Sequence, residues 1–176
     1  MDLIIRGYAP GDRDSVNRTA LAAFAQYEGE YDDWAAFSAG IGRMADLADG
    51  AELVVAERDA QVIGAVAYIG PGRASNPVFP DAWSVIRLFV VAPGHRGLGV
   101  GRRLVEACLQ AARRDQAPAV GLHTSPIMAS ALRLYGALGF QRDSDLPPIK
   151  GVPYGRYVLP AAGIDAALEL LRDNDG

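Results

Sequence analysis

Apolar positions in the first fifty residues recur at helical spacing after one short apolar run. Residues 3–6 are a predicted strand, which Pro10 ends. The positions that follow at helical spacing are Val16, Ala20, Ala23, Phe24 and Tyr27. We expect Asp12 to cap this helix, with its carboxylate accepting from first-turn amides. A second helical series covers residues 34–48.

From residue 52 the pattern changes to β-rich runs. Residues 52–57 and 61–69 are rich in valine, isoleucine and alanine, and the short segment between them predicts a hairpin. Residues 70–82 carry three prolines and two glycines, which predicts a loop. The run at 84–91, SVIRLFVV, is almost entirely apolar. Such a run is typical of a central strand buried on both faces.

Helices and strands alternate in the second half of the chain. We expect helices at 99–114, 127–138 and 161–172 and strands at 119–124 and 154–159, with another extended piece starting at Phe140. Residues 173–176 are expected to fray. The order β-α-α-β-β-β-α-β-α-β-β contains no repeat and no low-complexity linker. It predicts one α/β domain over residues 1–176, with antiparallel strands first and helical crossovers later.

Composition is ordinary for a globular protein and excludes several function classes. The 176 residues are 50% hydrophobic and 22% charged. A net charge of -4 argues against a general nucleic-acid binder. Two scattered histidines and a single cysteine, Cys108, make no recognisable metal site, and Cys108 falls in an apolar helical stripe. No stretch reads as a signal peptide or a membrane span, so we expect a cytoplasmic protein without a membrane partner.

A glycine-rich loop follows the apolar strand at 84–91, in the sequence VAPGHRGLGVGRRLV. Gly97, Gly99 and Gly101 allow a sharp backbone bend close to a ligand. The free amides of the next helical turn, together with Arg102 and Arg103, would face an anion. The spacing matches neither the dinucleotide fingerprint nor the Walker loop. The segment therefore predicts a phosphate cradle of another kind.

Two blocks carry a resemblance to a known family. The R-G-x-G-x-G loop after V-x-P resembles the Arg/Gln-x-x-Gly-x-Gly/Ala signature of the GNAT superfamily of N-acetyltransferases. Residues 131–140, ALRLYGALGF, resemble that family's A-x-x-L-Y-x-x-x-G-F segment. The strong match covers residues 84–140. It implies a single-domain GNAT-like fold with a mixed, mostly antiparallel sheet flanked by helices. It also implies acetyl transfer from acetyl-CoA to a primary amine by direct attack.

The resemblance also implies roles for particular residues. The strand end and the loop would bind the pantetheine arm and the pyrophosphate through Phe89, Val90, Val91, Arg96, Gly97, Leu98, Gly99, Val100, Gly101 and Arg102. Tyr135 would protonate the leaving thiolate, although its spacing also suits a core residue. Met128 stands where many relatives have asparagine, and Val85 where many have a glutamate base. His123 could act as base instead.

The sequence signal for the acceptor site is less specific than that for the cofactor site. Tyr27, Glu28 and Tyr31 lie in an acidic, aromatic segment where the family's acceptor site is usually walled, and its charge would attract a cationic amine. The alternative is a helix start, with Asp32 or Asp33 as cap. The resemblance implies a small-molecule or peptide amine as acceptor. Two other functions stay open: an acyl-CoA-binding sensor with little or no catalysis, and a nucleotide-binding regulator. The resemblance also allows a homodimer.

Overall fold

The computed structural model describes residues 2–73 and 76–173. The strands are β1 (Ile4–Gly7), β2 (Glu52–Arg58), β3 (Gln61–Ile69), β4 (Ser84–Val91), β5 (Ala119–Thr124), β6 (Gln141–Ile149) and β7 (Val152–Pro160). The helices are α1 (Arg13–Phe24), α2 (Trp34–Ile41), α3 (Val100–Arg114), α4 (Ala129–Leu138) and α5 (Ile164–Asp173). The predicted order of elements is confirmed.

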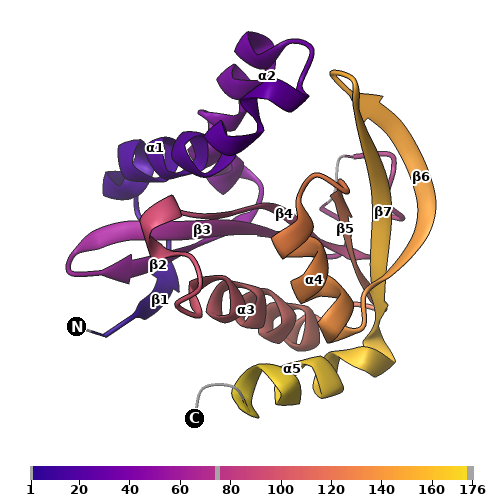
Figure 1. Ribbon diagram of the computed structural model, residues 1–176. Coiled ribbons are helices and arrows are strands. Elements are labelled where there is room, and N and C mark those ends of the chain that lie inside the picture. Colours follow the sequence, from indigo (N-terminus) through magenta and orange to yellow (C-terminus); the bar gives the residue numbers. More distant parts are fainter. Residues whose placement is uncertain (1, 74–75, 174–176) are drawn as a thin grey trace.

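One twisted sheet organises the molecule (Figure 1). Its seven strands run in the order β1-β2-β3-β4-β5-β7-β6. Neighbouring strands are antiparallel except β4 and β5, which are parallel. Helices α1 and α2 cover one face, and α3, α4 and α5 cover the other. This is the mixed, mostly antiparallel α/β domain that the sequence predicts.

The two faces of the sheet bury separate cores because side chains alternate along each strand. On the α1 face, Val16 and Ala20 pack against Val55 of β2. On the α3 face, Leu104 and Cys108 are completely buried. Burial raises the pKa of the Cys108 thiol, which fits the predicted role of a small buried hydrophobe.

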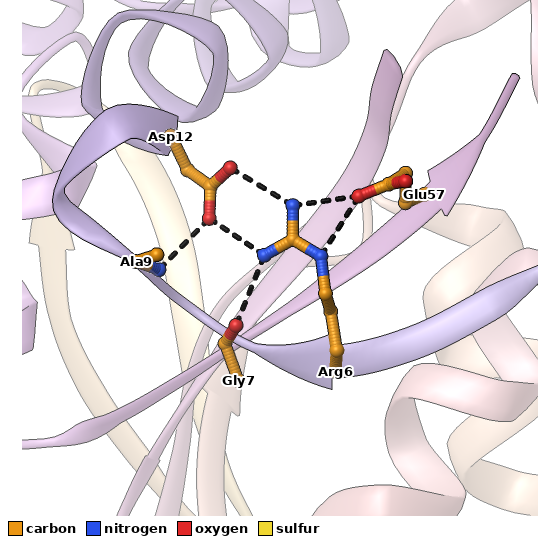
Figure 2. A network of polar contacts seen from close by, with 5 residues as sticks. All are labelled: Arg6, Gly7, Ala9, Asp12 and Glu57. Atoms are coloured by element: carbon orange, nitrogen blue, oxygen red, sulfur yellow. Dashed lines mark hydrogen bonds and ion pairs between the residues drawn. The ribbon is translucent and has the colours of Figure 1, made fainter. Parts of the chain in front are cut away.

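Asp12 does not cap α1 through its side chain, contrary to the sequence prediction. The carboxylate accepts from the Ala9 amide at 2.8 Å and from both terminal nitrogens of Arg6 at 2.8 and 2.9 Å. Arg6 also donates to Glu57 of β2 (Figure 2). A 3-10 turn, Pro10–Asp12, runs straight into α1, so Asp12 has helical backbone angles and its side chain turns back to β1.

Other boundaries differ from the prediction. The second helix ends at Ile41 because Gly42 caps it, and a 3-10 helix, Met44–Asp49, follows. The extended piece expected from Phe140 is β6, a strand at the sheet edge whose residues are mostly exposed and therefore show little apolar pattern. Of the tail expected to fray, residues 174–176 lie outside the described residues. Among the helices of the described chain, none is long and apolar enough to cross a membrane.

Candidate active site between strands β4 and β5

Strands β4 and β5 separate after a short parallel contact. They pair only at Ser84 with Val120 and at Val85 with Gly121. Beyond Val85, β4 continues to pair with β3 on its other side, up to Gly64 with Val91. The β5-facing edge of β4 is therefore open over its second half. An open edge presents backbone donors and acceptors to an extended ligand.

A β-bulge lies in the open half of β4. The register with β3 shifts between Ala65 and Ala67, and Leu88 has a positive φ of 49°. Arg87 pairs with Ala67 of the α1 face, and Leu88 packs into the α1-face core as well. A bulge sets an extra residue into the strand, so neighbouring side chains are re-aimed. Arg87 is exposed, which contradicts the prediction of a strand buried on both faces.

The glycine loop has the backbone geometry of an anion site. Gly97 and Gly99 have φ values of 74° and 79°, which favour glycine. Within the described chain, the amides from Gly97 to Arg102 donate to no backbone carbonyl; the next amide, of Arg103, donates to Gly99 at 3.2 Å. These unpaired amides lie at the start of α3, where the helix dipole is positive.

The two motif arginines behave differently. Arg96 donates from a terminal nitrogen to the Ala23 carbonyl at 2.9 Å, so its side chain joins the loop to the end of α1. The Nε atom of Arg102 is buried and has no hydrogen-bond partner. Leu98 is 55% exposed, and Val100 is buried in the α3-face core.

Gly101 is required for packing rather than for backbone angle. A Cβ at this position would lie 2.7 Å from the Phe89 ring. Phe89 in turn packs against Tyr135, with ring centroids 6.1 Å apart. The close approach of α3 to β4 therefore depends on a residue without a side chain.

A cavity of about 400 Å³ opens where β4 and β5 separate. Its lining comes from α1, α2, β4, β5, α4 and the β6–β7 turn, and it consists of Phe24, Ala36, Phe37, Gly40, Ile41, Ile86, Arg87, Leu88, Phe89, Leu122, His123, Thr124, Met128, Ala131, Tyr135, Ile149, Lys150 and Tyr154. Among these lining residues there is no aspartate or glutamate. A larger hollow of about 680 Å³ between β1–β2 and α3 contains neither Tyr135 nor His123.

His123 lies on β5 and reaches this cavity. Its ring packs against Tyr154 and Phe79, with centroids 5.6 and 6.2 Å apart. The Nδ1 atom is buried without a hydrogen-bond partner. Burial lowers the pKa of His123, and the nearby charge of Arg87 lowers it further. The imidazole is therefore neutral at neutral pH and can accept a proton.

Tyr135 of α4 also lines the cavity but is only 4% exposed. Its ring contacts Phe89 and Phe140, at centroid distances of 6.1 and 5.5 Å. Burial raises the pKa of its hydroxyl, with a smaller contribution from Cys108. The hydroxyl thus stays protonated over the physiological pH range and is available as a proton donor. Tyr135 is therefore a core residue that also lines the cavity, and its role as proton donor stays a prediction.

The segment between α1 and α2 packs an aromatic ring behind the wall of the cavity. Tyr31 is stacked on Phe37, with centroids 3.8 Å apart, and its hydroxyl is 2.5 Å from that of Tyr154. None of the three predicted acceptor residues lines the cavity: Glu28 is exposed, Tyr27 is half-buried, and Tyr31 lies behind the lining residues Phe37 and Tyr154. Asp33 accepts from the Ala36 amide at 3.1 Å, which confirms the predicted helix cap.

Met128, which stands in the place of an asparagine, also belongs to the cavity wall. It is the residue just before α4 and has a non-helical backbone. The Thr124 hydroxyl donates to its sulfur atom at 3.5 Å. The side chain is thus held against the end of β5 and offers no amide to a ligand.

Residues 14–140 match the model of the Acetyltransferase (GNAT) family. The chain belongs to this family. It is 33% identical over 139 residues to mycothiol acetyltransferase of Thermomonospora curvata, which covers 78% of the chain and 44% of that protein. The chain therefore spans less than half the length of this relative.

Solved GNAT structures share the fold. Ard1 from Thermoplasma volcanium superposes with a TM-score of 0.70 and 21% identity, over 91% of this chain and 98% of that one. The structure of yncA from Salmonella typhimurium with its cofactor acetyl-CoA gives a TM-score of 0.65 and 19% identity, over 91% and 94%. These likenesses concern the fold.

Several residues of the cavity were not predicted from the sequence. Arg87, Lys150 and Tyr154 all line it. Arg87 carried a signal, because it is the one charged residue in the run SVIRLFVV. Tyr154 carried none, since it enters the site through the β6–β7 hairpin, and Lys150 lies in the turn of that hairpin.

Proposed function

We propose that this GNAT family member transfers acetyl from acetyl-CoA to a primary amine. One observation carries the proposal. The open edge of β4 runs directly into the loop with the unpaired amides from Gly97 to Arg102, and both lie beside a cavity lined by Tyr135 and His123. The amides suit a pyrophosphate, and the strand edge suits an amide-bearing pantetheine arm.

Acetyl-CoA supplies the acetyl group as a thioester. In the proposed reaction the amine nitrogen bonds to the acetyl carbon, and the carbon–sulfur bond breaks. His123 accepts the proton that the amine loses, and the Tyr135 hydroxyl gives a proton to the departing thiolate. The lowered pKa of His123 and the raised pKa of Tyr135 support these assignments, because each group is then in the required form at neutral pH.

The test is release of free CoA thiol over a panel of primary amines. We expect turnover with at least one amine, and a loss of about 10²-fold or more in kcat for His123→Gln. The kcat/KM of the wild type should fall as pH drops through the folded pKa of His123, which lies below its ordinary value of 6.5. The variant should lack this acid limb.

The alternative, an acyl-CoA-binding sensor, predicts tight CoA binding without thiol release. A wild-type protein that binds CoA by calorimetry and acetylates no amine would favour it. A variant His123→Gln with the wild-type pH profile would instead leave proton removal to water. Cytoplasmic location and homodimer formation stay predictions.

A further inference from the structure

The two charged side chains that line the cavity are both cationic. Arg87 of β4 and Lys150 of the β6–β7 turn line it, and both are exposed. Among the described residues, neither takes part in an ion pair. No carboxylate lines the cavity itself, and the one beside the turn, that of Asp32, lies against Gly151 next to Lys150 and not beside Arg87. A guanidinium in this situation is a bidentate donor for a carboxylate.

Arg87 lies where the chemistry is proposed to occur. The last β4–β5 pair is Val85 with Gly121, and Arg87 and His123 each follow it by two residues. Side chains two residues apart on a strand share a face, so Arg87 and His123 lie opposite each other across the strand separation. An anion bound to Arg87 would therefore lie beside the proposed base.

The rest of the wall is apolar. Phe24, Phe37 and Ile41 line it from the α1 face, and Leu88 of the bulge joins them. A cavity of about 400 Å³ is in the size range of small-molecule sites. The lining therefore suits a small ligand with an apolar part and an anionic part.

We propose that the acceptor is a free amino acid with an apolar or aromatic side chain. Its carboxylate is held by Arg87 with help from Lys150, and its side chain packs on the aromatic wall. This inference deepens the proposed function and rests on it. The positive charges also favour the neutral form of the bound amine, which is the form that attacks a thioester.

The experiment compares two acceptors that differ in one group. L-Phenylalanine carries the carboxylate, and phenethylamine lacks it. Thiol release gives kcat/KM for both in the wild type, Arg87→Gln, Arg87→Lys and the control Arg172→Gln, which removes an exposed charge on α5. We use the ratio of the two kcat/KM values, because any effect of Arg87 acting through His123 cancels in it.

The wild type should prefer L-phenylalanine. Arg87→Gln should lower kcat/KM for L-phenylalanine by roughly 10- to 100-fold and change phenethylamine little, since a charge-assisted hydrogen bond is lost only for the former. Arg87→Lys should keep part of the preference, and Arg172→Gln all of it.

Equal loss for both acceptors, or a wild-type preference for phenethylamine, would overturn the proposal. A rise in the KM for acetyl-CoA in Arg87→Gln, with the acceptor ratio unchanged, would assign Arg87 to the cofactor and overturn it too. If no amine releases thiol, the proposed function fails. Calorimetry of L-phenylalanine against the CoA-saturated protein then decides the carboxylate site, and equal affinity in wild type and Arg87→Gln rejects it.

Discussion

The hydroxyl pair of Tyr31 and Tyr154 gives a prediction about stability with a definite sign. The two side chains are 6% and 5% exposed, and their oxygens are 2.5 Å apart. Tyr31→Phe leaves the Tyr154 hydroxyl buried without this partner, and Tyr154→Phe does the same to Tyr31. Leaving a buried polar group unpaired costs about 1–3 kcal/mol. Removing both hydroxyls leaves no orphan, so the double variant should be nearly as stable as the wild type.

The assays are urea unfolding, for the free energy of unfolding, and thermal unfolding, for Tm, of the wild type, both single variants and the double variant. For a chain of this length, 1 kcal/mol corresponds to about 2–4 °C in Tm, so each single change should lower Tm by roughly 2–12 °C. The coupling energy should be about 2–6 kcal/mol in the stabilising direction, because the two single losses sum to this and the double variant loses almost nothing. A matched cycle uses Tyr68→Phe, which removes a hydroxyl that donates to Asp115 at 2.9 Å from the α3-face core. The losses of stability from Tyr68→Phe and Tyr31→Phe should be additive. Additive losses in the Tyr31–Tyr154 cycle would refute the interpretation of the contact as a hydrogen-bonded pair.

Three further predictions concern the loop, the acid and the β1 network. Gly99→Asp should abolish CoA binding by calorimetry, because φ is 79° there and the new charge repels phosphate, whereas Gly29→Asp in an open, exposed position should bind normally. Tyr135→Phe should lower kcat by about 10²-fold and leave Tm nearly unchanged. A variant with the wild-type kcat across the pH range would mean that Tyr135 has a structural role only. Arg6 holds the pKa of Asp12 below its ordinary value of 3.8, so Asp12→Asn should destabilise the protein at neutral pH. The difference in unfolding free energy between wild type and variant should shrink as pH falls through the folded pKa of Asp12, and a difference that stays constant down to pH 2 would contradict this.

The order of elements and the glycine loop could be predicted because each depends on local pattern. An element's apolar spacing reflects the face that it buries, as in the helical series from Val16 to Phe24 and in the β-rich run at 61–69. The positive φ values of Gly97 and Gly99 follow from residue type and position. The role of Gly101 does not, because its reason is a Phe89 ring brought against it by the packing of α3 on β4.

The aromatic and cationic part of the cavity wall could not be predicted because distant segments form it. Tyr31 and Tyr154 are 123 residues apart in sequence, and no periodicity relates them. The acidic character of the 27–34 segment suggested a site for a cationic amine. In the fold, Asp33 caps α2 and Glu28 is exposed, while Arg87 and Lys150 supply the charge in the cavity. Composition along one segment therefore does not predict the charge of the cavity lining, which comes from other segments.

The bulge in β4 also sets a limit on how stable this domain can become. Leu88 keeps a positive φ of 49°, a region that costs a non-glycine residue roughly 1–2 kcal/mol. Glycine would relax the backbone at that point but would remove an apolar side chain from the cavity wall. Relief of the backbone and loss of buried apolar surface therefore act on stability in opposite directions at this position. The leucine should persist even in variants selected for heat resistance alone, because its side chain belongs to the α1-face core as well as to the cavity wall.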